Sequence, residues 1–486
     1  MIEAGHNAIV VGAGPNGLAA AITLARAGKS VLVLEARETI GGGSRTGELT
    51  LPGFKHDICS AIHPLGVASP FFRSLPLEDF GLDWLFPPVA VAHPLADGSA
   101  VSLTSREAGM IVGAGGDELA YRRLMQPLVD RWDALLEDIL GPFPLPPRHP
   151  FLLARFGWKA VQSAQHLAMS HFRGERAKTI FAGLASHSML PLEKAPSALF
   201  GLVLGMLAHA VGWPIPRGGS QHIVDALAAY LRTLGGKIIT GVEVNSLQEL
   251  PAAGVVLLDI TPRQLVQIAG DRLNDRYRRQ LGRYRYGPGV FKVDYALDGP
   301  VPWKAVDCHQ AGTVHLGGTL DEIMAAERDV WRGEHPDRPF VILAQQSLFD
   351  PARAPRGKHT LWAYCHVPPG SNVDMSGRIE DQIERFAPGF KDLILARRTH
   401  TAVELEEYNP NYVGGDINSG VQDLWQLFTR PVINLKPYAT ALKGIYLCSS
   451  ATPPGGGVHG MCGYHAAREA LRREFASKGK SEAAKV

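Results

Sequence analysis

A run of closely spaced glycines near the N-terminus has the pattern of a nucleotide-binding turn. The run is Gly12-Ala13-Gly14-Pro15-Asn16-Gly17. In such a turn the first glycine makes the tight bend, the second lets backbone N–H groups approach a pyrophosphate, and the third lets a helix pack closely against a strand. Unpaired N–H groups and the dipole at the start of that helix favour negative charge. The run therefore predicts that a dinucleotide binds here through its pyrophosphate.

The sequence on either side supplies the elements that must hold this turn. Apolar residues 8–11 come before it, an alanine-rich stretch over 18–27 follows it, and a second apolar run over 31–34 ends in Glu35. That order predicts a strand, a helix and a second strand, with an acidic residue where the second strand ends. Such an acid accepts hydrogen bonds from ribose hydroxyls. A glycine pattern alone is weak evidence, but a pattern framed by these elements is strong evidence for a dinucleotide site.

Length and composition limit the class of protein. The chain has 486 residues, of which 45% are hydrophobic and 20% charged, so it is long enough for two intertwined globular domains. A formal net charge of +2 gives no support for nucleic-acid binding. The five cysteines are scattered without a CxxC pair. This spacing predicts reduced thiols in a cytoplasmic protein and argues against both a disulfide framework and a metal site.

Two later blocks repeat the strand and helix pattern of nucleotide-binding sequence. In the second block Ser220 is the expected N-cap of a helix, and Gly235-Gly236 are expected to end it. Between the first block and the second, a hairpin is expected at Asp97-Gly98, and a helix is expected to begin at Asp117. The predicted helices are 117–140, 220–234 and 460–473, and the predicted strands are 237–240, 254–260, 290–297, 360–366 and 444–448.

The residues after Glu35 narrow the prediction to one superfamily. Glu35-Ala36-Arg37 is followed by Gly41-Gly42-Gly43-Ser44-Arg45-Thr46, and this opening resembles the FAD-binding start of the flavin amine oxidase and phytoene desaturase superfamily. The closing block over 444–467 is similar to the C-terminal FAD motif of the same superfamily. Motifs that resemble its subgroup of phytoene dehydrogenase-related oxidoreductases lie at 212–220, 409–416 and 451–461.

The resemblance implies a role for residues in each block. It implies that the second glycine loop and Arg45 lie against the pyrophosphate and flavin, and that Val244 contacts adenine through its backbone. Backbone N–H groups at the start of the last helix would stabilise reduced flavin. Relatives usually carry an acid against the ribityl chain where this chain has Ser449-Ser450, but a serine can still form that hydrogen bond. The implied contacts to noncovalent FAD are Gly12, Gly14, Pro15, Asn16, Gly17, Glu35, Ala36, Arg37, Gly42, Gly43, Ser44, Arg45, Val244, Ser450, Gly457, His459, Gly460 and Met461.

The expected fold is α/β, with a Rossmann-like FAD-binding domain and a second substrate domain of mixed sheet and covering helices. The FAD-binding domain is expected to come from three parts of the chain, because the nucleotide-type blocks are separated in sequence. These parts are 1–70, 212–265 and 431–476; the other predicted regions are a helical substrate or lid region over 71–211, the sheet of the substrate domain over 266–430, and a disordered tail over 477–486.

Two histidines are candidates for chemistry beside the flavin. His459 would steer a substrate or exchange a proton, or it is a structural histidine in a tight turn, and both interpretations remain open. His63 is also a candidate, although a structural role is favoured for it. Cys462 lies inside the noncovalent helix motif, which argues against a covalent flavin. Trp213 and Tyr464 are candidates to line the pocket.

The chain contains one complete GxGxxG unit, so a second dinucleotide-binding domain, for a nicotinamide cofactor, is not expected. The predicted function is FAD-dependent oxidation or desaturation of an apolar isoprenoid or lipid-like substrate by hydride transfer to flavin N5. Oxygen, a quinone or a protein carrier would accept the electrons. Three alternatives remain: amine oxidation, redox-neutral double-bond isomerisation, and a non-catalytic, flavin-stabilised assembly role. Aromatic residues, leucines and basic residues mix over 151–159 as they do in membrane-surface helices, which allows peripheral contact with a membrane; an ordinary amphipathic helix packed on the core is at least as good an interpretation.

Overall fold

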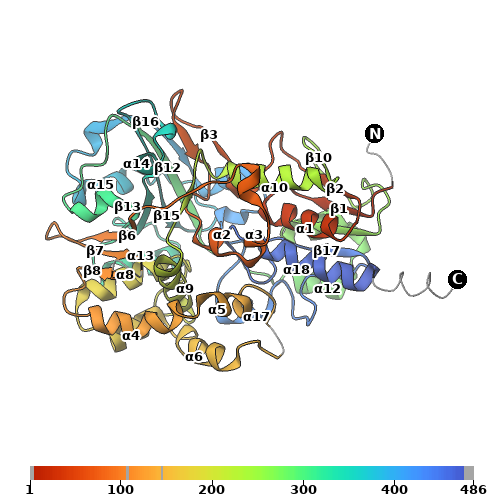
Figure 1. Cartoon of the computed structure of the whole chain (residues 1–486), viewed down its shortest axis with the longest axis horizontal. Helices are drawn as coiled ribbons and strands as arrows, with labels where there is room; N and C mark the ends of the chain where they lie inside the picture. Colours follow the sequence, from red (N-terminus) through yellow and green to blue (C-terminus); the bar gives the residue numbers. More distant parts are fainter. Residues whose placement is uncertain (1–4, 106–108, 144–145, 476–486) are drawn as a thin grey trace.

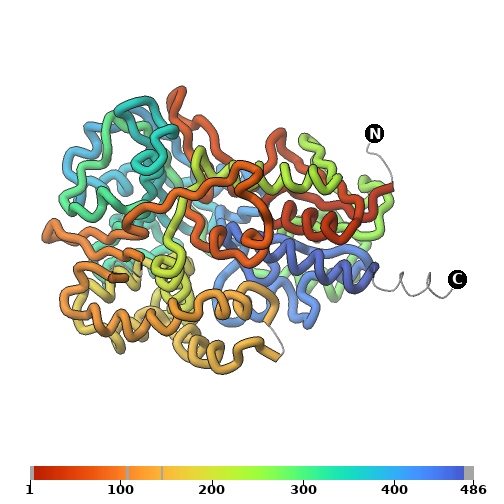
Figure 2. The backbone as a smooth tube through the Cα atoms, in the orientation of Figure 1, coloured from red at the N-terminus to blue at the C-terminus, as the bar shows by residue number. Residues whose placement is uncertain are grey.

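The computed structural model describes residues 5–105, 109–143 and 146–475. It has two halves, one built on a parallel sheet and the other on a mixed sheet, and the chain passes between them repeatedly (Figure 1 and Figure 2). This architecture confirms the predicted fold class. The predicted tail over 477–486 lies outside the described residues.

A five-stranded sheet forms the core of the first half, with the order β10-β2-β1-β11-β17. All of its strand pairs are parallel, and its central strands are buried on both faces, which explains their continuous apolar sequence. Three separated stretches of chain supply the strands. Their bounds are Ala8–Val11 (β1), Val31–Leu34 (β2), Lys237–Ile239 (β10), Val255–Leu258 (β11) and Ile445–Leu447 (β17).

The register of this sheet brings the predicted site residues together. The last residue of β1, Val11, pairs with Leu34 of β2 and with Leu258 of β11. The residues that follow these strands therefore lie at one edge of the sheet. In an open parallel sheet, ligands bind at this carboxyl edge.

Helices cover both faces of the parallel sheet. On one face α1 packs closely against α18, and a Cβ on Gly463 of α18 would lie 1.8 Å from the carbonyl oxygen of Asn16. Only glycine allows this approach. The helices on this face are Pro15–Arg26 (α1), Gln221–Thr233 (α10) and Met461–Ala470 (α18), and those on the other face are Pro262–Ala269 (α11) and Asp275–Leu281 (α12).

The second half is built on an eight-stranded sheet with the order β16-β12-β15-β14-β13-β6-β7-β8. Its pairs are antiparallel except β13 with β6, which is parallel. The region over 71–211, predicted as helical, supplies three of these strands, and the hairpin at Asp97-Gly98 joins two of them. The bounds are Val89–Pro94 (β6), Ala100–Thr104 (β7), Ile111–Val112 (β8), Gly289–Leu297 (β12), Ala311–Leu316 (β13), Val341–Ala344 (β14), His359–Val367 (β15) and Ile394–His400 (β16).

A layer of helices packs on one face of the mixed sheet, at the lower side in Figure 1. Helix α15, Ser376–Phe386, covers the opposite face through a separate apolar cluster. The remaining helices are Pro64–Ala68 (α2), Pro70–Arg73 (α3), Glu118–Val129 (α4), Trp132–Ile139 (α5), Pro150–Ala160 (α6), Ala164–His171 (α7), Glu175–Ser186 (α8), Ser197–Ala210 (α9), Leu320–Trp331 (α13), Gln346–Phe349 (α14), Ala402–Tyr408 (α16) and Leu424–Thr429 (α17). Two short antiparallel pairs join Thr46–Glu48 (β3) with Lys55–Asp57 (β4), and Trp84–Leu85 (β5) with Ile215–Pro216 (β9).

Three local predictions need correction. The helix predicted over 117–140 is broken, because Arg131 leaves the helical conformation between α4 and α5. Asp117 precedes α4 but does not cap it, since its carboxylate accepts hydrogen bonds from the N–H groups of Arg173 and Gly174. Ser220 precedes α10 but donates its hydroxyl proton to the carbonyl of Ser60. In both capping errors a tertiary contact takes the side chain.

Among the described residues, no helix has both the length and the apolar character needed to cross a membrane. The buried His209 bonds the Tyr121 hydroxyl at 2.8 Å and the Thr104 carbonyl at 2.7 Å, so it is a core histidine with both ring nitrogens paired.

Candidate functional site

Two adjoining cavities lie at the carboxyl edge of the parallel sheet. We name each by one lining residue, the Glu35 cavity and the Trp362 cavity. The Glu35 cavity lies against the ends of β1 and β2, and the Trp362 cavity extends to the mixed sheet. The residues that line both are Gly14, Gly42, Asp259, Asn409 and Asn411. Because these residues are shared, the cavities form one continuous site between the two sheets.

The Glu35 cavity collects predicted contacts from two separated blocks. Glu35 follows β2 directly, and Val244 comes from the loop after β10, so neighbouring strands bring the two blocks together. The predicted residues that line this cavity are Gly12, Gly14, Glu35, Ala36, Arg37, Gly42, Arg45 and Val244.

Glu35 is held rigidly at the wall of its cavity. Its carboxylate accepts hydrogen bonds from the N–H groups of Ala13 at 2.8 Å and Arg37 at 3.0 Å, and it pairs with Arg45 at 3.1 Å. Arg45 also donates to backbone carbonyls, including that of Thr39 at 2.7 Å. The resemblance implied that Arg45 lies against the pyrophosphate and flavin. Arg45 lines the Glu35 cavity, and its ion pair fixes the orientation of Glu35; its contact with the pyrophosphate and flavin stays a prediction.

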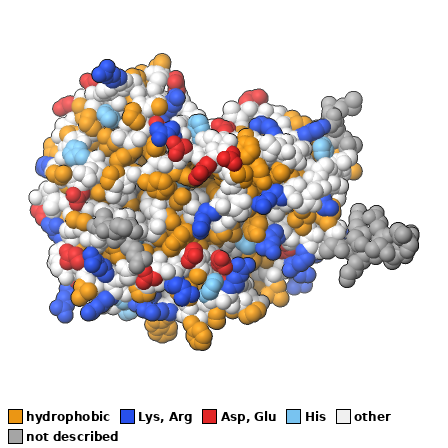
Figure 3. Space-filling model, viewed as in Figure 1, with side chains coloured by type: hydrophobic (Ala, Val, Ile, Leu, Met, Phe, Trp, Pro, Cys, Tyr) orange, Lys and Arg blue, Asp and Glu red, His pale blue; other side chains and the backbone are white. Residues whose placement is uncertain are grey.

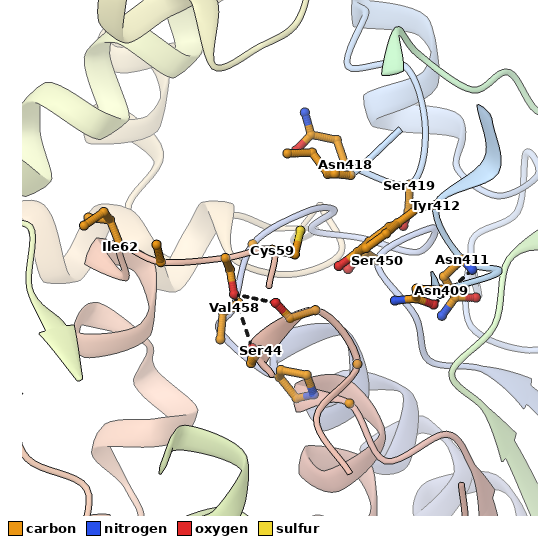
Figure 4. A pocket seen from close by; sticks show the side chains of 18 of the residues that line it. Ser44, Cys59, Ile62, Asn409, Asn411, Tyr412, Asn418, Ser419, Ser450 and Val458 are labelled. Carbon is orange, nitrogen blue, oxygen red and sulfur yellow. Dashed lines mark hydrogen bonds between the residues drawn. The ribbon is translucent and has the colours of Figure 1, made fainter. Parts of the chain in front are cut away.

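The Trp362 cavity collects the other group of predicted contacts. Figure 4 shows Ser44, Cys59, Tyr412, Ser450 and Val458 gathered around it from distant parts of the chain. Asn16 donates a hydrogen bond to the Ser450 hydroxyl at 3.2 Å, so the first and last blocks meet here. The predicted residues that line this cavity are Gly14, Pro15, Asn16, Gly42, Gly43, Ser44, Ser450 and Gly457. Trp213 also lines it.

Six predicted site residues line neither cavity: Gly17, His63, His459, Gly460, Met461 and Tyr464. The Nδ1 atom of His459 accepts a hydrogen bond from the Met461 N–H at 3.0 Å. That N–H was expected to face flavin, but the side chain of His459 satisfies it. A Cβ on Gly460 would lie 2.7 Å from the Phe72 ring, so a side chain does not fit at this position.

Both candidate histidines have structural partners. Burial lowers the pKa of His63 and of His459 to about 4, so both rings are neutral at neutral pH. Ser220 donates its hydroxyl proton to Ser60 and therefore accepts from Nε2 of His63, at 2.8 Å. This geometry favours the structural interpretation of both histidines over a catalytic one.

Asp259 is the main site residue that the sequence analysis missed. It follows β11 directly, lines both cavities, and accepts a hydrogen bond from the Gly17 N–H at 2.9 Å. Burial and the nearby charge of Glu35 raise the pKa of this carboxyl group to about 7. A signal was present, because Asp259 lies near the carboxyl end of the predicted strand 254–260, the fourth one predicted for the nucleotide sheet.

The floor of the Trp362 cavity is one face of the mixed sheet. Thr313 and Ile342 come from neighbouring strands, and Trp362 and Tyr364 come from the next strand. His187, at the end of α8, and Trp213 complete this end of the cavity. Sequence patterns assign such residues to strands and helices, but the pairing of strands far apart in the chain decides that they share a cavity.

The five cysteines form no disulfide bond. All five are free and buried, and the described residues contain no cluster of His, Cys, Asp and Glu placed to hold a metal ion. The Cys462 thiol donates weak hydrogen bonds to the carbonyls of Thr452 and Gly455, and burial raises its pKa to about 12. It lines neither cavity.

Comparison with known proteins finds similarity over most of the chain. Residues 10–75 match the model of the NAD(P)-binding Rossmann-like domain. The chain is 28% identical to pyridine nucleotide-disulfide oxidoreductase domain-containing protein 2 of Mus musculus, over 96% of this chain and 93% of that protein. It is 25% identical to the neurosporene-forming phytoene desaturase of Rhodobacter capsulatus, over 94% of this chain and 92% of the desaturase.

A solved structure shares the fold at low sequence identity. Cyclohexylamine oxidase from Brevibacterium oxydans superposes with a TM-score of 0.61 at 14% identity, covering 98% of this chain and 99% of the oxidase. The predicted resemblance to phytoene desaturase-related oxidoreductases is confirmed, and the likeness to the amine oxidase shows a shared fold. The prediction of an oxidoreductase is confirmed, and residues 10–75 form a Rossmann-like, nucleotide-binding domain.

Proposed function

We propose that the protein binds one FAD noncovalently along the two joined cavities and oxidises or desaturates an apolar, isoprenoid or lipid-like substrate. The observation that carries this proposal is the continuity of the two cavities through Gly14 and Gly42 of the two glycine loops. The adenosine part would lie in the Glu35 cavity, where Glu35 can accept hydrogen bonds from ribose hydroxyls. The flavin would lie in the Trp362 cavity.

The residues at the junction fit an elongated polar cofactor. Side-chain amide oxygens of Asn16 and Asn411 are buried there without a hydrogen-bond partner among the described residues. The Cα atoms of Gly14 and Gly42 face each other, and a Cβ on Gly42 would lie 3.3 Å from the Gly14 Cα. Side chains here would narrow the passage between the cavities. The unpaired amide oxygens offer acceptors to hydroxyl groups of a ribityl chain or ribose.

Bound FAD would supply the hydride acceptor, at N5 of the flavin. The contribution of this chain is to orient the substrate and to exclude water. Ile62, Ile342 and Ile417 line the Trp362 cavity together with the indole rings of Trp213 and Trp362, and an apolar substrate would be desolvated against them. No step requires His63 or His459, which keep the structural contacts described above.

Amine oxidation is the second candidate, because aromatic side chains surround the cavity and a structural neighbour is an amine oxidase. An aromatic cage attracts a cationic amine. However, Asp259 is the one carboxylate among the described residues that line the Trp362 cavity, and it lies at the glycine loop rather than at the mixed sheet. A cation at the sheet end would therefore lack a counter-charge, which favours an uncharged substrate.

The test is anaerobic reduction of the FAD-loaded protein by a panel of isoprenoids, acyl lipids and primary amines. Loss of flavin absorbance with an isoprenoid or acyl lipid is the expected result. Bleaching by amines alone would move the proposal to amine oxidation. If no compound bleaches the flavin, the oxidative proposal fails, and isomerisation or an assembly role gains support.

We also propose that the electron acceptor is oxygen, a quinone or a protein carrier, since the chain has one dinucleotide-binding glycine unit.

An anionic membrane surface is the proposed source of the substrate. Phe151 and Trp158 on α6 are 91% and 78% exposed, and the exposed Arg155 lies between them on the same face. Figure 3 shows hydrophobic side chains protruding at the lower edge, where α6 lies in Figure 1, with basic side chains nearby. Exposed aromatic residues beside cations are typical of contact with anionic lipid.

A further inference from the structure

The sheet end of the Trp362 cavity contains polar atoms that lack partners. The Thr313 hydroxyl and the Trp362 indole N–H are buried without a hydrogen-bond partner among the described residues. Thr313 is 1% exposed and Trp362 is 7% exposed, and both line the cavity. Because most buried polar groups in proteins are paired, two unpaired groups in one cavity point to a ligand that pairs with them.

Strand register places these two side chains on the same face of the mixed sheet. Thr313 of β13 lies opposite Ala344 of β14, and Ala344 lies opposite Trp362 of β15. Directly opposite residues of antiparallel strands point to the same side. The small side chain of Ala344 therefore separates Thr313 from Trp362 in one row. His315 lies two residues beyond Thr313 on β13, so it shares this face.

His187 reaches this row from the end of α8. Its Nε2 atom lies 3.1 Å from Nε2 of His315, and the two ring centroids are 5.1 Å apart. His187 lines the cavity, and its Nδ1 atom has no hydrogen-bond partner among the described residues. Burial lowers the pKa of His187 to about 3 and that of His315 well below its usual value. Both rings are therefore neutral, and in the pair one Nε2 donates and the other accepts.

The surroundings of His315 decide which ring donates. Its Nδ1 atom is buried without a partner, pressed against Gly183 of α8. A buried N–H without an acceptor is rarer in proteins than an acceptor without a donor. His315 therefore carries its proton on Nε2 and donates to His187. The accepting Nε2 of His187 has no proton, so the proton of this neutral ring lies on Nδ1, which becomes a donor toward the cavity.

We propose that the ligand of this cavity is a largely apolar molecule that carries a carbonyl or hydroxyl oxygen, held by His187, Trp362 and Thr313. The proposal rests on the proposed function in taking this cavity as the substrate site, and it narrows the substrate class from hydrocarbons to oxygenated apolar molecules. Two N–H donors match the two lone pairs of one oxygen. A cationic amine has no acceptor to offer them.

The first test measures binding without turnover. Farnesene, farnesol and farnesal share a C15 chain and differ in the terminal group, and each would be titrated into FAD-loaded protein with oxidised flavin. Quenching of tryptophan fluorescence reports binding, because Trp213 and Trp362 line the cavity. The wild type should bind farnesal or farnesol more tightly than farnesene. Equal or tighter binding of farnesene, or no binding of the oxygenated probes, would overturn the proposal.

Matched variants assign the preference to the named residues. His187→Phe should weaken farnesal binding about tenfold, and Thr313→Val about threefold, with little effect on farnesene, as expected for the loss of one hydrogen bond. Ile342→Val, in the same cavity, should change the affinity for all three probes equally. An unchanged preference in His187→Phe would overturn the proposal. Binding does not require flavin reduction, so oxygenated probes that bind without bleaching would support this inference while the proposed oxidation fails.

The second test reads the proton position directly. Nitrogen-15 NMR of protein labelled at histidine, with His187→Gln to assign the signal, distinguishes the two neutral tautomers. A proton on Nδ1 of His187 is the expected result. A proton on its Nε2 would make His187 an acceptor toward the cavity and would contradict the inferred donor.

Discussion

Asp259 should make the affinity for FAD depend on pH. Its carboxyl group touches the glycine loop through the Gly17 N–H at 2.9 Å and has a pKa raised to about 7 by burial and by Glu35. The pyrophosphate of FAD brings more negative charge to the same loop, which favours the protonated acid and raises this pKa further. FAD binding above pH 7 should therefore take up a proton. Affinity should be flat below about pH 6 and should fall as the pH rises.

The size of this effect follows from Coulomb's law. One negative charge at roughly 5 Å and an effective dielectric constant of about 20 costs about 3 kcal/mol, or about 2 pKa units. With Asp259 titrating near 7 in the free protein and near 9 in the complex, the dissociation constant should rise roughly 50-fold between pH 6 and pH 9. Other ionisable groups near Asp259 are Glu35, paired with Arg45, and the buried thiols of Cys448 and Cys462.

The assay is titration of apoprotein with FAD, followed by quenching of flavin fluorescence at several pH values. Asp259→Asn keeps the shape and an acceptor for Gly17 but removes the titration, so its affinity should vary less than threefold over the same range. Glu243→Gln is the matched control, because Glu243 is exposed and lines the Glu35 cavity. This control should keep the wild-type pH dependence. A flat profile for the wild type, or a steep one for Asp259→Asn, would refute the reasoning.

Three further predictions concern the ribose contact, the membrane surface and the reductant. Glu35→Gln should weaken the affinity for FAD about tenfold, because the ribose hydroxyls would then donate to a neutral acceptor in place of a charged one. The same change at the exposed Glu38 should leave the affinity unchanged. Equal affinities of the wild type and Glu35→Gln in a fluorescence titration would exclude the ribose role. The double variant Phe151→Ser, Trp158→Ser should no longer co-sediment with phosphatidylglycerol vesicles, whereas Val306→Ser, at an exposed residue elsewhere on the surface, should still do so. If the wild type instead forms concentration-dependent dimers and the double variant does not, this surface mediates self-association. NADPH should reduce the bound flavin slowly if at all in anaerobic stopped flow, and rapid bleaching by NADPH would favour a reductase.

The sequence predicted those parts of the site that lie close together in the chain. Gly14 and Glu35 belong to one strand-helix-strand unit, so spacing alone indicated that they flank one ligand. The prediction of Val244 required a family resemblance, because its loop joins the site through the pairing of β10 with β2. Asp259 could have been predicted from its place after a strand, but a single acidic residue gives no periodic signal.

The substrate end was not predictable in the same way. Thr313 and Trp362 face one cavity because β13, β14 and β15 pair in a particular register, and register between distant strands is set by tertiary packing. His187 joins them from a helix in the region that was predicted as a helical lid. The flavin-facing role expected for Gly460 and Met461 came from the resemblance, and local packing of His459 and Phe72 now argues against it.

Identification of the cofactor tests the central claim most directly. The protein would be purified, denatured with acid, and its supernatant and pellet separated and analysed by chromatography with absorbance detection. About one intact FAD per chain in the supernatant is the predicted result. Absence of flavin, release of FMN in place of FAD, or flavin retained in the protein pellet would contradict a noncovalent FAD bound along the two joined cavities.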